Sequence, residues 1–113
     1  MATQYKNARF SLTGTAQTTV LTLSVSSRAI LQNIQTENVS SGTTTVTAHV
    51  YDASATSTSQ ITTTKISTMT TVNLAKGPIF LEESDALKLK AGTGNVIKGM
   101  ISYALLTGDQ GTA

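Results

Sequence analysis

Hydrophobic and polar residues alternate along most of the chain, a pattern typical of β-strands that bury one face. Within residues 43–51, for example, Val46, Ala48 and Val50 share one face of the predicted strand, and His49 lies on the opposite, polar face. The same alternation predicts strands over residues 18–25, 29–36, 70–74, 87–91 and 96–106, with shorter candidates at 5–12, 60–67 and 79–81. No segment combines helical spacing with capping residues, so we predict a protein built from strands.

Turn-forming residues separate the predicted strands. Ser40-Ser41-Gly42 and Gly77-Pro78 mark two connections, and residues 92–95 (Gly-Thr-Gly-Asn) are typical of a hairpin loop. Residues 52–59 are small and polar, which predicts a mobile loop and a place for partner contact. Eight or nine short strands at this spacing indicate an all-β fold, either a β-sandwich or a small barrel. We predict a single antiparallel β-sandwich with either a jelly-roll or an immunoglobulin-like strand order.

The predicted strand at residues 96–106 is apolar on both faces towards its end. Tyr103 and Leu105 face one way, while Ala104 and Leu106 face the other. A strand with two apolar faces is expected in the centre of a sheet or at an interface.

The 113 residues fit one domain, residues 1–113, with one hydrophobic core. The net charge is only +2, and the basic residues are dispersed along the chain. They do not form the concentrated cationic patch that nucleic-acid binding requires, so we predict no nucleic-acid partner. The chain shows no apolar run long enough to span a membrane and no secretory signal, which predicts a protein made inside a cell and no membrane partner. The absence of cysteine excludes a disulfide framework, a thiolate metal site and a cysteine nucleophile.

Serine and threonine supply 34 of the 113 residues. Threonine suits a strand because it is β-branched, and its hydroxyl group can face water. A sheet covered by threonine rather than by lysine and glutamate has few charges to prevent another strand from pairing with its edges. The composition therefore fits two interpretations: a protein that contacts copies of itself or a partner, and a soluble Thr-rich sandwich without such contacts.

Residue patterns that would carry chemistry are weak throughout. His49 is the only histidine, and no motif brings it to a serine and an aspartate, so we expect it to pack or hydrogen-bond within its strand. Glu82, Glu83 and Asp85 lack the ligand spacing of a calcium loop, and we expect a solvated turn in which Asp85 accepts backbone N–H groups. Residues 92–94 lack the other residues of a phosphate-binding loop. We therefore predict no catalytic residue, no cofactor and no metal, and a protein that is not an enzyme.

The order of several strand and turn segments is distinctive. Residues 29–35 (Ala-Ile-Leu-Gln-Asn-Ile-Gln) precede Asn38 and the alternating strand that ends at Tyr51. They are followed by residues 77–82 (Gly-Pro-Ile-Phe-Leu-Glu) and 85–89 (Asp-Ala-Leu-Lys-Leu). The last strand carries Ser102-Tyr103. Over residues 18–106 this order resembles small β-sandwich virion structural proteins of tailed bacteriophages. Relatives often carry Pro-Ala-Gly before the Ile-Leu strand, where this chain has Ser26-Ser27-Arg28.

The resemblance implies a non-enzymatic component of the virion, assembled in the host cytoplasm. Proteins of this kind include capsid decoration (cement) proteins, which bind the major capsid protein and stabilise the head, and neck, collar or tail-associated proteins. We take decoration as the leading hypothesis and the neck or tail role as its alternative, with self-association expected. A small carbohydrate-binding module is a third hypothesis, which would need exposed aromatic platforms.

Contacts with virion partners are expected from the termini and from the predicted loop. Residues 1–9 and 107–113 are possible contact arms, and the candidate contact residues are Tyr5, Lys6, Arg9, Ser54, Thr56 and Ser57. We expect deletion of residues 1–9 to weaken binding to the particle and to leave the sandwich folded. A deletion product that unfolds would show instead that the segment is an integral strand.

Overall fold

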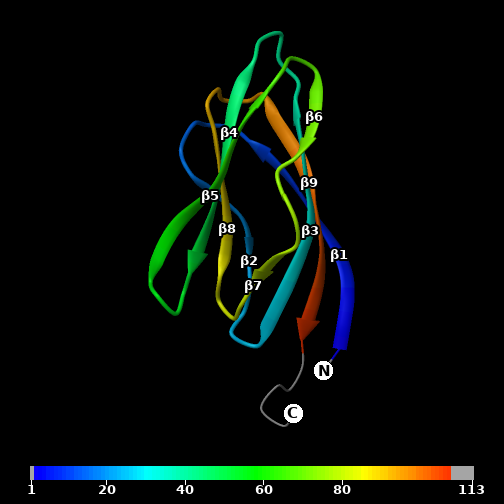
Figure 1. Ribbon diagram of the computed structural model, residues 1–113, viewed down its shortest axis with the longest axis vertical. Helices are drawn as coiled ribbons and strands as arrows, with labels where there is room; N and C mark the ends of the chain where they lie inside the picture. Colours follow the sequence, from blue (N-terminus) through cyan, green and yellow to red (C-terminus); the bar gives the residue numbers. More distant parts are fainter. Residues whose placement is uncertain (1, 108–113) are drawn as a thin grey trace.

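Nine strands make up the regular structure of the computed structural model, which describes residues 2–107 (Figure 1). They are β1 (Ala2–Leu12), β2 (Thr18–Thr22), β3 (Ser27–Asn38), β4 (Thr44–Asp52), β5 (Ser57–Ile66), β6 (Thr70–Asn73), β7 (Ile79–Leu81), β8 (Ala86–Ala91) and β9 (Ile97–Thr107). The described residues include no helix that is long and apolar enough to cross a membrane. The predicted all-β fold is confirmed.

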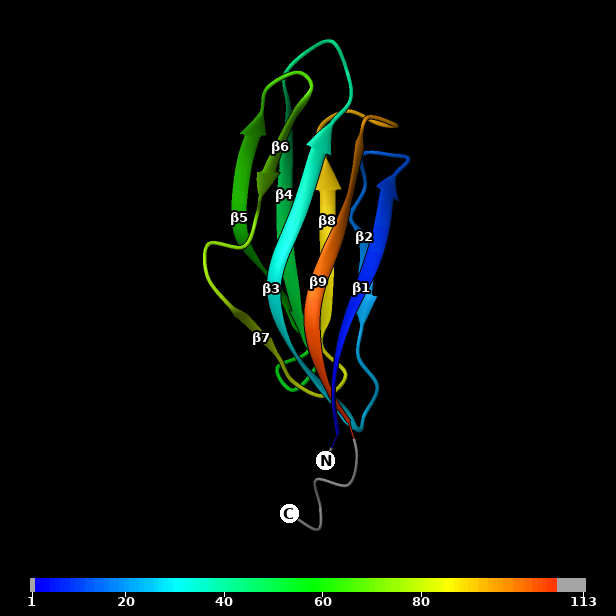
Figure 2. The same cartoon turned by 90° about the vertical axis from the view of Figure 1, so that its right-hand side faces the viewer.

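Two antiparallel sheets pack face to face. The five-stranded sheet has the order β1-β9-β3-β6, with β7 also paired to β3, and the four-stranded sheet has the order β2-β8-β4-β5. Figure 1 views the two layers edge-on, and Figure 2 shows the five-stranded sheet in front of the four-stranded one. The predicted antiparallel β-sandwich is therefore confirmed.

Successive strands mostly alternate between the two sheets. The connection from β4 to β5 joins two neighbouring strands of one sheet, whereas β8 and β9 lie in different sheets. The prediction of a hairpin loop at residues 92–95 is therefore wrong. These residues cross between the layers instead: Gly92 N–H donates to the carbonyl of Thr45 (2.7 Å) in the four-stranded sheet, and Asn95 N–H donates to that of Leu12 (3.1 Å) in the other.

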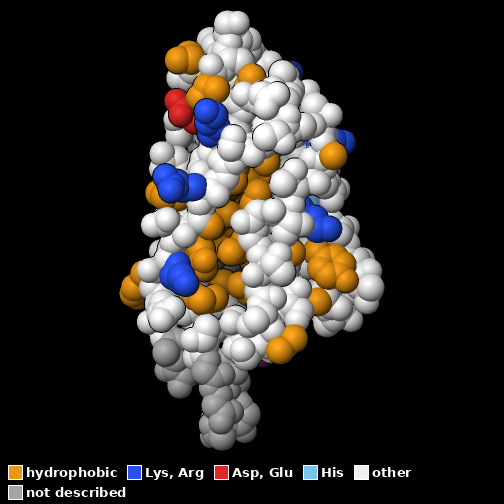
Figure 3. Space-filling view, turned by 180° about the vertical axis from the view of Figure 1, so that it is seen from behind, with side chains coloured by type: hydrophobic (Ala, Val, Ile, Leu, Met, Phe, Trp, Pro, Cys, Tyr) orange, Lys and Arg blue, Asp and Glu red, His pale blue; other side chains and the backbone are white. Residues whose placement is uncertain are grey.

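The hydrophobic core lies between the sheets and comes from the alternating positions of their strands. The five-stranded sheet supplies Leu31, Ile34, Ile97 and Ile101, and the four-stranded sheet supplies Val46, Ala48, Leu87 and Leu89; all eight are fully buried. At the margin where β1 and β2 lie, partly buried apolar side chains extend the core to the surface, where they form a strip between the layers (Figure 3).

Strand β9 is an interior strand of the five-stranded sheet, which agrees with the first of the two positions that its apolar faces predicted. It pairs with β1 along Ala2–Leu12 and with β3 from Ser27 to Asn38. Gly99 stands where the backbone is most crowded, because a Cβ added there would lie 2.0 Å from the Gln35 carbonyl oxygen and 2.6 Å from Phe10 Cζ. The glycine lets the Phe10 ring lie over the strand.

The predicted contact arms now have defined positions. Residues 2–9 belong to β1 and are paired with β9 throughout, so this segment is a strand of the sandwich rather than a separate arm, although its contact with a partner stays a prediction. Of the second arm, Thr107 ends β9 beside Ala2 and Ser27, and residues 108–113 lie outside the described residues.

Candidate partner-binding surface

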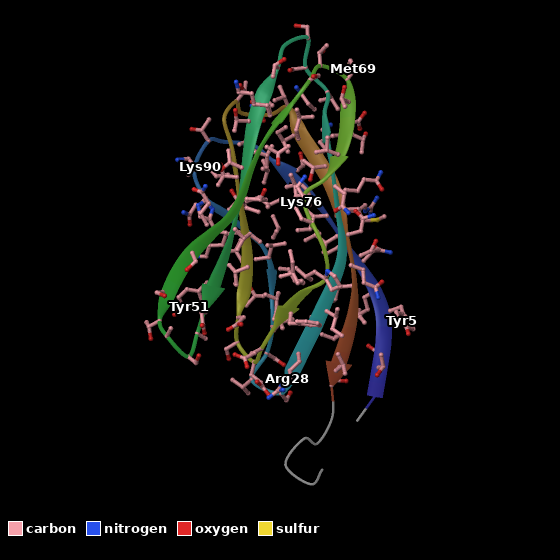
Figure 4. The ribbon with its side chains drawn as sticks, in the orientation of Figure 1. Tyr5, Arg28, Tyr51, Met69, Lys76 and Lys90 are labelled. Atoms are coloured by element: carbon pink, nitrogen blue, oxygen red, sulfur yellow. The ribbon has the colours of Figure 1, made fainter. Side chains whose placement is uncertain are left out.

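A row of apolar residues crosses the outer face of the five-stranded sheet. Tyr5 of β1 pairs with Ala104 of β9, Ala104 with Ile30 of β3, and Ile30 with Phe80 of β7, so the four residues lie in register across four strands. Tyr5 is 80% exposed and Phe80 70% exposed. We call these four residues the apolar row. Figure 4 shows Tyr5 pointing away from the body of the molecule.

A hollow of about 340 Å³ lies at the Phe80 end of the row. Ile30, Phe80 and Leu106 line it together with Arg28 and Glu82. Large aromatic side chains that remain exposed beside an apolar hollow are typical of protein-binding surfaces, because covering them removes much apolar area from water.

The signal for this surface was present in the sequence as the second apolar face of β9. Ala104 and Leu106 alternate with the core residues Ile101 and Tyr103, and therefore lie on the outer face. Phe80 and Ile30 carried no comparable signal, because the pairing of β7 with β3 across 50 residues of sequence is decided by the fold.

The sequence-predicted contact residues fall on three different parts of the surface. Tyr5 and Arg9 lie on the outer face of the five-stranded sheet, Arg9 opposite Met100. Lys6 occupies an alternate position of β1 and lies on the other face of that sheet. Ser54, Thr56 and Ser57 belong to the region between β4 and β5, in the other layer. The structure therefore brings Tyr5 and Arg9 to one face and does not bring the six residues together.

Half of the predicted mobile loop at residues 52–59 belongs to strands. Asp52 ends β4 and Ser57 begins β5, which leaves residues 53–56 as a tight turn. Asp52 Oδ1 accepts hydrogen bonds from the backbone N–H (3.1 Å) and the hydroxyl (2.8 Å) of Ser54. The Ser54 hydroxyl, followed by the backbone N–H groups of Ala55 and Ser54, holds the pKa of Asp52 below its ordinary value. The connection is therefore a four-residue turn closed by local hydrogen bonds rather than the eight-residue loop that the sequence predicted.

The acidic turn at residues 82–85 is held by its own carboxylate. Asp85 is buried, its Oδ2 accepts the N–H of Glu82 (3.0 Å), and its Oδ1 accepts the N–H of Ala53 (3.0 Å). The prediction that Asp85 fixes this turn is confirmed. The fold also brings Asp52 close to Glu82 and Asp85, although Asp52 is distant from both in the sequence. Asp85 nevertheless uses both oxygens to bind backbone groups of two connections.

An ion pair borders the hollow next to this turn. Arg28 Nε donates to Glu83 Oε2 at 2.9 Å. This hydrogen bond lowers the pKa of Glu83 and raises the pKa of Arg28. Both side chains are partly exposed, so the pair gives the apolar surface a charged border and contributes little to stability.

His49 lies on the predicted face of β4, but it is 9% exposed rather than open to solvent. Its neighbours in the sheet are Lys88 on β8 and Gln60 on β5, and Lys88 in turn lies 5.3 Å from the centre of the Tyr51 ring. Within the described residues no hydrogen bond reaches His49 Nδ1. The side chain is covered by its neighbours on the sheet, which is a packing role.

Comparison with solved structures shows where this fold occurs. The chain is similar to one from the acidic stable capsid of Helicobacter pylori bacteriophage KHP30, with a TM-score of 0.57 and 13% identity over 93% of this chain and 87% of that one. It is also similar to a chain from Bacillus endospore appendages, described as disulfide-linked pili, with a TM-score of 0.54 and 11% identity over 92% and 84% of the two chains.

A third similar structure is that of infectious bursal disease virus, Gx strain, with a TM-score of 0.51 and 12% identity over 96% of this chain and 33% of that one. This chain therefore spans about a third of the length of that viral protein. No protein-family model and no curated protein matches the sequence. At these identities the likeness establishes a shared β-sandwich fold.

Proposed function

We propose that this protein is a non-enzymatic structural component of a bacteriophage virion, and specifically a capsid decoration protein that binds the major capsid protein through the outer face of its five-stranded sheet. The observation that carries the proposal is the apolar row, because two aromatic residues exposed at 80% and 70% on a paired sheet face form an apolar surface that another protein can cover. Its location is then the virion.

Two further observations support a virion role. The strand orders β1-β9-β3-β6 and β2-β8-β4-β5, with most successive strands in different sheets, support a jelly roll, an architecture that viral capsid domains use. The structures that share the fold include chains from a phage capsid and from another virus. A neck, collar or tail-associated protein is the alternative, because the same fold and surface would serve a ring of subunits.

The likeness to a pilus chain favours a second candidate, the subunit of a self-assembling filament. The disulfide links named for those pili cannot be made by this chain, which has no cysteine. A filament of this protein would need non-covalent contacts alone, and electron microscopy of the purified protein distinguishes filaments from discrete particles.

Protein copy number per particle tests the decoration role. We expect quantitative mass spectrometry of purified virions to find this protein at a ratio to the major capsid protein near one to one or a simple fraction of it. A few copies per hundred capsid subunits would assign the protein to the neck or tail, and absence from virions would overturn the virion role altogether.

A further inference from the structure

Strand β5 is an open edge of the four-stranded sheet. Among the described strands it pairs with β4 alone, so one side of its backbone has no strand partner. Figure 2 shows β5 at the margin of the rear layer. The N–H and C=O groups along such an edge are a template for another strand.

The other edges of the sandwich are short or charged. Strands β2, β6 and β7 have five, four and three residues. Strand β1 is long but carries Lys6 and Arg9, and charged side chains on an edge oppose pairing with a second chain. Residues 57–64 of β5 contain no charged residue and no proline. Residues 57–64 of β5 therefore form a long edge segment that carries no charge of its own.

An apolar hollow of about 300 Å³ lies beside this edge. Ile61, Leu74, Pro78 and Ile79 line it together with Lys76. A register shift leaves Ile61 without a partner on β4, and its side chain is 42% exposed. A strand added along β5 would cover Ile61 and the opening of the hollow.

We propose that β5 pairs antiparallel with β5 of a second copy of this chain, so that two four-stranded sheets join into one continuous sheet of eight strands. The occupant is a second copy because the edge is complementary to itself. It carries hydroxyl and amide side chains, and its one charge, Lys65, lies near the end, so antiparallel pairing keeps the two Lys65 residues apart. The required side-chain contacts already occur in the monomer, where the hydroxyls of Thr47 and Thr63 lie 3.3 Å apart across β4 and β5.

This pairing has a geometric consequence for the proposed function. Two antiparallel strands in one sheet are related by a two-fold axis perpendicular to the sheet, so both copies present the same face on the same side. The outer faces of the two five-stranded sheets, each with its apolar row, then lie on one side of the dimer. If these faces bind the capsid, the dimer binds at two points, and its two contacts reinforce each other. This consequence rests on the proposed function, whereas the pairing itself does not.

Sedimentation of the purified protein tests the pairing without any partner. We expect a reversible monomer–dimer equilibrium in the wild-type protein and a monomer after Ile61→Lys, which places a charge at the edge. Val25→Lys introduces the same side chain at a position that is 81% exposed and outside the strands, and it is expected to leave the dimer intact. A wild-type protein that stays monomeric at all concentrations overturns the inference, as does a dimer that Ile61→Lys leaves unchanged.

Single-cysteine variants locate the contact, because the chain has no cysteine of its own. Self-pairing places residues near the two-fold axis opposite their own copies, so we expect one or two of Thr58→Cys, Gln60→Cys, Thr62→Cys and Thr64→Cys to form a disulfide-linked dimer on mild oxidation. Circular dichroism checks that each variant is folded. Cross-linking through Tyr5→Cys or Phe80→Cys with none along β5 would place the dimer contact on the other sheet and overturn the inference.

Discussion

Two buried polar side chains hold the connections at the two ends of the sandwich. Asn38 is fully buried; its Nδ2 donates to the carbonyls of Gly42 (2.7 Å) and Ile66 (2.9 Å), and its Oδ1 accepts the N–H of Ser40 (2.9 Å). Asp85 plays the same role beyond the other end of β4, where it binds the connection that leaves this strand and the turn before β8. Because each binds more than one connection, neither loop can move without leaving a buried polar group unpaired.

Asp85→Asn should therefore destabilise the protein. An asparagine keeps one oxygen, so either the Ala53 N–H or the Glu82 N–H loses its acceptor in a buried position, and we expect a loss of about 1–3 kcal/mol in the free energy of unfolding. Urea denaturation followed by circular dichroism measures it. Asp52→Asn is the matched control, because a single oxygen of Asp52 accepts all the bonds to residues 54 and 55 and asparagine retains it. Equal losses in the two variants would contradict this role of Asp85.

At the scale of the elements, pairing along β9 explains why β1 belongs to the fold. Strand β9 is paired on both sides, with β1 and β3, over its whole length. The inward-facing residues of β1 change from Gln4 and Lys6 to Ala8 and Phe10, which pack against the core. One part of the strand therefore contributes backbone pairing and the other contributes apolar burial as well.

Deletion of residues 1–9 is now expected to unfold the protein, which reverses the expectation from sequence. The deletion removes the partners of β9 from Thr107 to Met100 and exposes the central strand. We expect the cooperative thermal transition to be lost, as measured by circular dichroism. Tyr5→Thr keeps the backbone pairing and should keep the transition. A folded deletion product that binds particles poorly would restore the view of residues 1–9 as a contact arm.

At the scale of the whole molecule, different surfaces carry different proposed contacts. The apolar row crosses the outer face of the five-stranded sheet, and β5 lies at the edge of the other sheet (Figure 2). One surface can bind a foreign protein while the other binds a second copy, because neither uses the residues of the other. Their separation lets the two proposals be tested independently.

Phe80→Ser tests the apolar row. Phe80 is 70% exposed, so its replacement should leave the thermal transition unchanged and weaken binding to capsid shells that lack this protein by at least about tenfold. Met69→Ser is a matched control, since Met69 is 69% exposed and lies at the opposite end of the molecule (Figure 4). Cosedimentation with the shells measures both. Equal binding by the two variants would exclude the row from the contact, and failure of the wild-type protein to bind would contradict the decoration role.

Local pattern made most of the fold predictable. Alternation identified Val46 and Ala48 as core residues and the strands that contain them, because side chains on a strand change face at every residue. The two apolar faces of β9 predicted a strand in the centre of a sheet or at an interface, and β9 is paired on both sides. The same reasoning placed a hairpin at residues 92–95, since a Gly-rich turn indicates a reversal of the chain but not which sheet the next strand joins.

The candidate surface was only partly predictable, for a physical reason. Tyr5 and Arg9 were identified because they belong to an exposed polar segment. Phe80 belongs to the apolar run Ile-Phe-Leu, and only the pairing of β7 with β3 shows which face of the sheet it takes. The burial of His49 was missed because lateral neighbours on adjacent strands, Lys88 and Gln60, cover it. Sequence pattern describes the two faces of a strand and says nothing of the strands beside it.

The sequence by itself predicted a sandwich of eight or nine strands and the face of each strand on which a given residue lies. It also contains none of the catalytic and metal-binding motifs considered above. These properties depend on neighbours in the chain. Only the tertiary structure decided which strands are edges, which exposed residues form the apolar row, and that Asp52 lies beside Asp85. Those properties depend on pairing between strands that are distant in sequence. The packing of the whole core determines which of these strands pair.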